Sequence, residues 1–378
     1  MDFSFTSEQD QLRDTVAKLV SQKYDFDTRR KVAKSEAGWR PEMWSQFAEL
    51  GLLGASFTEA EGGFGSGPIE AMIISEEFGK GLVIEPYLQT VVIGGNFFRH
   101  GGTDAQKEEH IAGIIGGETR FAFAYSEPKS RFDLNDVSTT AKKDGAGYTL
   151  NGHKAVVIGA PFATHLIVTA RTSGAQRDAN GITVFLVARN AKGVTTRDYP
   201  TVDGLRASEV YFENVAVGAD AVIGKVDGGL PLVEKVVDNA IAALCAEAVG
   251  CFKVLNEATI SYAKQRKQFG QSIATFQVLQ HRMVDMFMAA EQASSMTYMV
   301  TLKLDEADKA RKLAASAAKV QIGKAGKLVS QDAVQIHGGM GMTDELNVGH
   351  FFKRVTMIDS QFGNTDWHLR RYTELSNG

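Results

Sequence analysis

The sequence predicts an α+β fold in which helical segments flank a central β-domain. Two observations lead to this prediction. Helical periodicity dominates residues 1–118 and 227–378, whereas residues 119–226 contain short β-branched or aromatic runs separated by turn signals. We therefore expect an N-terminal α-helical domain (1–118), a middle antiparallel β-domain (119–226) and a C-terminal four-helix bundle (227–378).

The N-terminal part contains three helix-like segments with recognisable ends. The first follows Ser7, with Asp10 three residues later in an arrangement close to a capping box. The second, "RPEMWSQFAELGLLG", has a proline at its start and a glycine at its end. The third, "IEAMIISEEFGKGL", follows the glycine-rich stretch "EGGFGSG". These signals predict short helices joined by tight loops.

The middle part reads as a series of short strands. Apolar runs such as "RFAFAYSE", "HLIVTART", "ITVFLVA" and "SEVYFENVAV" alternate with the turn dipeptides Asp144-Gly145, Asn151-Gly152 and Asn180-Gly181. No helical pattern separates these runs, which favours an antiparallel sandwich or barrel.

The C-terminal part contains three long helical runs. One continues without proline from Pro231 to the basic stretch "YAKQRKQ", and two more follow it. The simplest place for the methionines of the second run is the bundle core, because methionine fills irregular gaps; they are residues 283, 286, 288, 296 and 299.

Composition excludes several functional classes. The net charge is −4 and no basic block occurs, which argues against nucleic acid as the main partner. The charged N-terminus does not resemble a signal peptide, and no apolar run is long enough to span a bilayer. The only two cysteines, Cys245 and Cys251, suit a reducing compartment, so we expect a cytoplasmic protein. The eight histidines form no metal-binding motif, so no metal site is expected.

Two helix ends carry candidate ligand-binding residues. The run "DAVQIHGGMGM" (332–342) places glycines after a helix, where they can simply form a C-cap or can let backbone N–H groups approach a phosphate. In "YAKQRKQFGQSIATFQVLQ", Arg266 can offer a forked donor to a diphosphate, and Phe269 can offer an apolar surface to a ring. Either segment alone is a weak signal.

Several motifs together resemble the acyl-CoA dehydrogenase family over essentially the whole chain. They are "ELGLLGASFTEAEGGFG", "AYSEP", "YTLNGHKAVVIGA", "DGLRASEVYFENVAV", "RKQFG…FQVLQ" and "VQIHGGMGM", in family order. The resemblance implies oxidation of an acyl-CoA thioester to trans-2-enoyl-CoA with FAD, in a tetramer. It also implies that residues of this chain reach the FAD of a neighbouring subunit: Arg266, Gln268, Phe269, Ile273, Phe276, Gln335, Gly338 and Gly339.

The chain departs from the family where the flavin ring would bind. Ser126-Glu127-Pro128 is kept, so Ser126 remains a weak candidate flavin contact, but "KSRFDLND" replaces the family's "GAGSD". The family's Trp-Ile-Thr edge becomes Val156-Val157-Ile158, which removes a side-chain hydrogen bond near the ring. The flavin-facing half of this chain is therefore expected to be weakened.

The usual catalytic base is also missing. Phe362 stands where many members have a glutamate, and Ala240 stands where others have one. Glu247 lies seven residues after Ala240, on roughly the same helix face, and is the remaining candidate catalytic base. The alternative is a structural glutamate bonded to a nearby arginine or backbone group.

These departures resemble the small subunits of heteromeric members, such as that of pimeloyl-CoA dehydrogenase. The resemblance implies a larger partner subunit, an electron-transfer flavoprotein or similar acceptor, and a dicarboxylyl- or bulky alicyclic acyl-CoA substrate. Arg131 could meet a distal carboxylate, although a solvated arginine is the simpler interpretation. Lys154 and Arg206 are expected to be structural. Alternatives are a self-sufficient homotetramer with Glu247 as base, a non-catalytic structural subunit, and an acyl-CoA oxidase.

Overall fold

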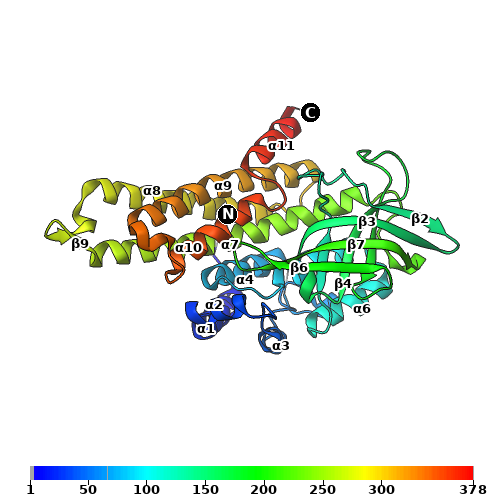
Figure 1. Ribbon diagram of the computed structural model, residues 1–378, viewed down its shortest axis with the longest axis horizontal. Coiled ribbons are helices and arrows are strands. Elements are labelled where there is room, and N and C mark those ends of the chain that lie inside the picture. The colour runs from blue at the N-terminus through cyan, green and yellow to red at the C-terminus, as the bar shows by residue number, and fades with distance from the viewer. Residues whose placement is uncertain (1–3, 66, 378) are drawn as a thin grey trace. The chain divides into compact units, whose positions relative to one another are not determined.

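The computed structural model describes residues 4–65 and 67–377, and it divides the chain into two compact units (Figure 1). The first, here called the helical unit, combines the chain up to Val32 with Pro68–Val83 and the chain from Ile241 onward. The second, the sheet unit, combines Ala33–Gly67 with Ile84–Ala240. Helix α7 (Leu230–Gln265) starts in the sheet unit and continues into the helical unit. The division at 118/119 and 226/227 stays a prediction from the sequence.

The helical unit is built from long helices, of which α8 and α9 run side by side (Figure 1). Their length follows from the uninterrupted helical patterns of the C-terminal part. Besides α7, its elements are α1 (Ser7–Lys23), α2 (Phe26–Lys34), α4 (Pro68–Gly81), β9 (Lys267–Gln268), β10 (Gln271–Ser272), η5 (Ile273–Thr275), α8 (Gln277–Leu302), α9 (Asp308–His337), η6 (Gly338–Met342), α10 (Asn347–Ser360) and α11 (Thr365–Asn377).

Helix α1 begins with a complete capping box, one residue earlier than the sequence suggested. Its N-cap is Thr6, whose hydroxyl accepts from the Gln9 backbone N–H at 3.3 Å, while the Gln9 side chain accepts from the Thr6 N–H at 3.1 Å. The Ser7–Asp10 pairing was therefore wrong. Gln9 and not Asp10 completes the capping box. The Gln9 amide also donates to buried Glu70 of α4 at 2.9 Å, which a carboxylate could not do.

Helices α4 and α7 cross at two glycines. A Cβ atom on Gly79 would lie 2.1 Å from the backbone oxygen of Glu247, and one on Gly250 would lie 2.0 Å from that of Glu76. Real side chains do not tolerate such separations, so the two backbones touch only because both positions lack a side chain. The contact continues at the Cys251 thiol, which is 3.4 Å from the Gly79 carbonyl oxygen.

The sheet unit consists of one eight-stranded sheet with short helices. The strand order is β6-β7-β3-β2-β4-β5-β8, and β1 also pairs with β4. The strands are β1 (Phe121–Ala124), β2 (Thr140–Asp144), β3 (Gly147–Ile158), β4 (His165–Arg171), β5 (Ile182–Ala188), β6 (Val194–Pro200), β7 (Arg206–Val217) and β8 (Val222–Ile223). The helices are α3 (Pro41–Glu49), η1 (Glu59–Glu61), the π-helical η2 (Leu88–Gly94), α5 (Gly95–Gly101), α6 (Asp104–Ile115), η3 (Ala160–Phe162) and η4 (Ala219–Ala221).

The pairing is mostly antiparallel, but β1 and β2 are both parallel to β4. Residues 121–124 pair with 165–168, and Thr140 pairs with Arg171 farther along the same strand. The 125–139 segment therefore carries the chain forward along β4 instead of reversing it in a hairpin. The expectation of a purely antiparallel domain was wrong at these two pairs.

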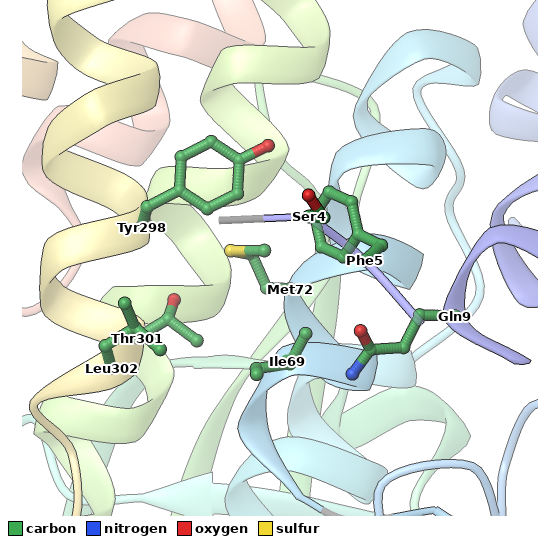
Figure 2. A pocket seen from close by; sticks show the side chains of 8 residues that line it. All are labelled: Ser4, Phe5, Gln9, Ile69, Met72, Tyr298, Thr301 and Leu302. Carbon is green, nitrogen blue, oxygen red and sulfur yellow. The ribbon is translucent and has the colours of Figure 1, made fainter. Parts of the chain in front are cut away.

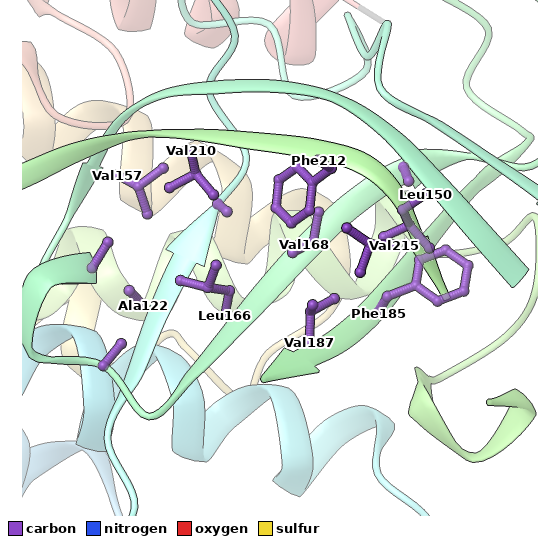
Figure 3. Packing of buried hydrophobic residues seen from close by; sticks show 14 of the residues in the cluster. Ala122, Leu150, Val157, Leu166, Val168, Phe185, Val187, Val210, Phe212 and Val215 are labelled. Carbon is purple, nitrogen blue, oxygen red and sulfur yellow. The ribbon is translucent and has the colours of Figure 1, made fainter. Parts of the chain in front are cut away.

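Alternate residues of the strands form the core of the sheet unit. Figure 3 shows Leu150 and Val157 of β3 packed with Val210 and Phe212 of β7, and with Phe185 of β5. All of these side chains are at most 2% exposed. Val210 and Phe212 lie two positions apart on β7, so both side chains point to the same face of the sheet and into this core.

None of the helices in the described part of the chain combines the length and hydropathy needed to cross a bilayer. Within the same residues, no group of three or more His, Cys, Asp or Glu side chains is placed to hold a metal ion.

Candidate functional site

The end of α7 carries an exposed hairpin. Strands β9 and β10 pair through Gln268 and Gln271, and the two residues between them, Phe269 and Gly270, both have positive φ (54° and 80°). Positive φ at both turn positions matches the twist of a two-residue hairpin. The Phe269 ring at the tip is 91% exposed. A phenylalanine that the chain leaves so uncovered is available to a ligand or another subunit.

The end of α9 forms a glycine loop. The helix stops at His337, where Gly338 has φ +61°, and residues 338–342 continue as a 3₁₀ turn. The C-cap interpretation was therefore correct. Apart from the adjacent residues of the chain, no atom of the described residues lies within 4 Å of where a Cβ would stand on Gly338 or Gly339, so their backbone is also open to a ligand. Capping and ligand access coexist in this loop.

Tyr262 of α7 brings these two helix ends together. Its ring stacks on that of His337 with centroids 4.3 Å apart, and its hydroxyl donates to the His337 carbonyl oxygen at 3.4 Å. Arg266 follows Tyr262 by one helical turn. Its backbone N–H continues the helix by donating to the Tyr262 carbonyl oxygen at 2.8 Å. The hairpin and the glycine loop, far apart in the sequence, thus form one region.

We call this region the hairpin–loop surface. Its polar side chains are exposed, and those of Arg266 and Gln335 have no hydrogen bond or ion pair to any other described residue. Ile273 is nearly buried and Phe276 half-buried, and the Phe276 ring meets that of Phe269 edge-on at 6.2 Å. The surface consists of Arg266, Gln268, Phe269, Gln335, Gly338 and Gly339. It offers a guanidinium, bare backbone and an aromatic ring.

A buried ion pair supports the edge of the sheet unit near Ser126. Lys154 is fully buried, and its Nζ donates to Glu127 Oε1 at 2.8 Å, to the Tyr125 carbonyl and to the Thr169 hydroxyl. Burial alone would raise the pKa of Glu127, but the charge and hydrogen bond of Lys154, with further hydrogen bonds, lower it to about 2. Burial lowers the pKa of Lys154 to about 8 despite its partner. The lysine is structural, as expected.

The segment that follows Lys154 is irregular. The pairing of β3 with β7 shifts register between Lys154 and Val157, and Val156 in the bulge has φ +53° and is 47% exposed. Glu209 of β7 holds the bulge, because its carboxylate accepts from the Val156 N–H at 3.4 Å and from the Tyr199 hydroxyl at 2.9 Å. Sequence reasoning missed Glu209; a β-branched residue with positive φ leaves no trace in the sequence pattern.

Comparison with known proteins decides the family. Family models match the acyl-CoA dehydrogenase N-terminal domain at residues 6–118, the middle domain at 122–215 and the C-terminal domain at 227–374. The chain belongs to the acyl-CoA dehydrogenase family. Members are oxidoreductases that act on the CH–CH bond of an acyl-CoA, and they bind FAD.

Individual relatives cover nearly the same length as this chain. A 3-(aryl)acrylate reductase of Clostridium sporogenes is 31% identical over 86% of this chain and 87% of its own. The butyryl-CoA dehydrogenase structure from Megasphaera elsdenii has a TM-score of 0.92 at 25% identity and covers all of both chains. A variant of the steroid ACAD Tcur3481-Tcur3483 has a TM-score of 0.88 at 26% identity, over 98% of each chain.

The hairpin–loop surface fits the adenosine diphosphate half of FAD. The side chain of Arg266 bonds to no other described residue, the backbone of Gly338 and Gly339 is uncovered, and the Phe269 ring is 91% exposed. The flavin-ring half fits less well. Ser126 is half-buried and its carbonyl is taken by the Ala155 N–H, and the exposed residue of the bulge is the apolar Val156. The hairpin–loop surface therefore offers more groups that can bind FAD than the chain's own flavin edge, which contains Ser126 and Val156.

Glu247 is paired in the structure. Its two carboxylate oxygens accept from Arg354 Nε at 2.5 Å and from Nη2 at 2.7 Å, and the two side chains are 14% and 5% exposed. This geometry matches the structural alternative. Its role as catalytic base stays a prediction, and it would require the carboxylate to leave a bidentate partner.

The family's two usual base positions carry no carboxylate here. Ala240 is fully buried, and Phe362 is 8% exposed with φ +56°. The Phe362 backbone is held in place because its carbonyl oxygen lies 3.0 Å from Nε2 of buried His368.

The remaining candidates are placed as follows. Arg131 is exposed on a loop with φ +51°, so its substrate role stays a prediction. Arg206 is structural: its Nη2 donates to the Ser35 carbonyl oxygen at 2.6 Å and ties that loop to β7. The assignment of all five methionines of α8 to the core was wrong, because Met286 is buried but Met288 is 48% exposed.

A small pocket of about 70 Å³ lies elsewhere in the helical unit, between α1, α4 and α8 (Figure 2). Its lining is largely apolar and includes Phe5, Met72 and Tyr298. None of its eight lining residues is charged, so it offers no attraction to a CoA or flavin phosphate.

Proposed function

We propose that this chain is the smaller subunit of an α2β2 acyl-CoA dehydrogenase, in which its hairpin–loop surface completes the FAD site of a larger partner. One contrast carries the proposal. The hairpin–loop surface keeps an exposed Phe269 and an Arg266 whose side chain bonds to no other described residue, whereas the chain's own flavin edge has Val156 at its exposed position and Phe362 replaces the base. A subunit that retains one half of the site and loses the other needs a partner to supply the second half.

The chemistry of the surface supports this role. Arg266 would hold the diphosphate with a forked pair of hydrogen bonds, and the uncovered backbone of Gly338 and Gly339 would add donors. Gln335 would supply a further donor, and Phe269 would cover the adenosine. The bound FAD would accept the hydride from the β-carbon of the acyl-CoA. This chain's residues hold and orient the cofactor.

We propose a dicarboxylyl- or bulky alicyclic acyl-CoA as the substrate and an electron-transfer flavoprotein or similar acceptor as the redox partner. The exposed Arg131, which follows Ser126 by five residues, supports a distal carboxylate on the substrate. The likeness to a steroid acyl-CoA dehydrogenase supports a bulky acyl group.

The test is to purify the chain alone and together with a larger family member encoded beside it, and to measure bound FAD and turnover. We expect low flavin content and no turnover from the lone chain, and both from the pair. Full FAD loading and turnover by the lone chain would refute the proposal.

Two rivals make different predictions for single substitutions. A self-sufficient homotetramer with Glu247 as base predicts that Glu247→Gln abolishes turnover, whereas our proposal predicts that turnover by the pair survives. A purely structural subunit predicts that Arg266→Ala and Gln335→Ala leave the flavin content of the pair unchanged. Our proposal predicts that both substitutions lower it.

A further inference from the structure

Helix α10 contacts the glycine loop, and helix α2 contacts the residues that directly follow it. A Cβ atom on Gly349 of α10 would lie 3.1 Å from the backbone oxygen of Gly341, so the start of α10 packs directly on the loop. The next residue, His350, is buried, and its ring meets Phe26 of α2 edge-on at 4.9 Å. His350 therefore lies between α2 and the residues that follow the glycine loop.

Both ring nitrogens of His350 are engaged. Nδ1 lies 3.3 Å from Nη1 of the buried Arg29, which can only donate, so Nδ1 must accept. Nε2 lies 3.1 Å from the Asp344 carboxylate and 3.3 Å from the Asp344 carbonyl oxygen, so Nε2 must carry the proton. The neutral imidazole protonated at Nε2 satisfies both sides at once.

Two neighbouring contacts reinforce this arrangement. Arg29 Nε donates to the carbonyl oxygen of Leu82, the residue after α4, at 3.3 Å. This hydrogen bond fixes the position of the guanidinium. Arg30 Nη1 donates to the Asp344 carbonyl oxygen at 3.1 Å and pairs with Asp27. Helix α2 thus holds the residue two positions after the glycine loop at two points.

We propose that His350 is a positioning residue that, as a neutral imidazole, couples Arg29 to Asp344 and so holds the glycine loop in the form that receives a flavin diphosphate. The inference rests on the function proposed above for the hairpin–loop surface. Protonation would place an N–H on Nδ1 against the donors of Arg29 and would break the coupling. The grip on the diphosphate therefore weakens in acid.

The charges around His350 favour the neutral imidazole that the coupling needs. Arg29 of α2 and Lys353 of α10 face it as cations, and Asp344, held by Arg30, faces it as an anion. Burial, followed by the charge of Arg29, lowers the pKa of His350 below its usual 6.5, although Asp344 opposes the change. A group with a lowered folded-state pKa costs stability as the pH falls below 6.5. At neutral pH the coupling is intact.

The experiment compares unchanged protein with His350→Phe, which keeps the ring contact with Phe26 but has no ring nitrogens, and with His350→Gln, whose amide can donate to Asp344. The matched control is His281→Phe, at an exposed position of α8 in the same unit. Hydrogen–deuterium exchange of residues 338–346 is measured in the full chain without flavin at about pH 7.5 and 5.5. FAD affinity of the chain with its partner is measured at the same pH values.

In the unchanged protein and in His281→Phe, we expect exchange at 338–346 to increase in acid beyond its intrinsic pH dependence, and FAD to bind about tenfold more weakly. In His350→Phe both should be already weakened at pH 7.5 and then insensitive to pH, and His350→Gln should recover part of the loss. A folded His350→Phe protein with unchanged exchange and FAD affinity at both pH values would overturn the inference.

Arg266→Ala separates this inference from the proposed function. If Arg266→Ala lowers FAD affinity and His350→Phe does not, only the positioning role of His350 is wrong. If neither substitution changes FAD affinity while His350→Phe removes the acid response of exchange, the coupling is supported and the proposed flavin surface is wrong.

Discussion

Lys154→Met should destabilise the sheet unit by about 3 kcal/mol at pH 7. The substitution keeps an unbranched side chain, one atom shorter, but removes the cation that faces Glu127 in a site where the two side chains are 0% and 4% exposed. Removing one partner of a buried pair typically costs about 3–5 kcal/mol. The lower end applies because Glu127 keeps hydrogen bonds from Ser138 and from the Thr139 N–H.

The titration of Glu127 gives the pH dependence of this contribution. Its pKa falls from 4.5 to about 2 in the folded chain. The folded state therefore favours ionised Glu127, whereas the burial of Lys154, which lowers its pKa to about 8, opposes this stabilisation. Because the folded-state pKa is lowered, the contribution is complete above pH 4.5 and is lost as the pH falls toward about 2. Lys154→Met should flatten this acid dependence.

The assay is urea denaturation followed by the fluorescence of Trp39 and Trp44, which both belong to the sheet unit. Lys142→Met is the matched control, because Lys142 is exposed on β2 and should cost almost nothing. In the double variant Lys154→Met/Glu127→Gln, part of the loss should be recovered because no buried charge is left unpaired. A cost below about 1 kcal/mol, or an equal cost for Lys142→Met, would refute the reasoning.

Three further predictions concern packing and reactivity. Gly250→Ala should cost about 3 kcal/mol, because its Cβ would lie 2.0 Å from the Glu76 backbone oxygen; a melting temperature within about 2 °C of that of the unchanged protein would contradict this. Cys245 and Cys251 should not react with a thiol reagent near pH 8 until urea is added, because burial raises the pKa of Cys245 to about 12 and that of Cys251 further. Early labelling of either thiol would show that the helical unit opens locally. Arg206→Lys should cost about 1–2 kcal/mol by the same urea assay, because an ammonium does not reproduce the position of the Nη2 group that donates to the Ser35 carbonyl oxygen; unchanged stability would argue against this contact.

The sequence patterns predicted the elements well where local chemistry decides them. Long runs with a period near 3.6 became α7, α8 and α9, and the apolar runs of the middle part became strands. Strand β6 (Val194–Pro200) was missed, because most of its side chains are at least partly exposed and carry no apolar alternation. The start of α1 was displaced by one residue, because Gln9 takes its place through a contact with Glu70, which is 61 positions away.

The candidate site was predictable only in part for the same reason. Motifs pointed to Arg266 and to the glycine loop, but not to the ring contact of Tyr262 with His337 that joins them. The pairing of Glu247 with Arg354 links positions 107 residues apart, and that of Arg29 with His350 links positions 321 apart. Periodicity and turn chemistry report on neighbours along the chain, so such partners require the folded structure.

The crossing of α4 with α7 has a consequence for the distant end of the longer helix. Gly250 precedes Arg266 by 16 residues, which is about 24 Å along a helix axis. At the crossing, main chain lies directly against main chain. No side chain can rearrange there to let α7 shift, so the crossing acts as a fixed pivot. A small change in the tilt of α7 at this pivot would displace the hairpin tip, which carries Phe269, farther than it displaces the crossing itself. A substitution in α4 at the crossing would therefore displace the hairpin–loop surface without changing any of its residues.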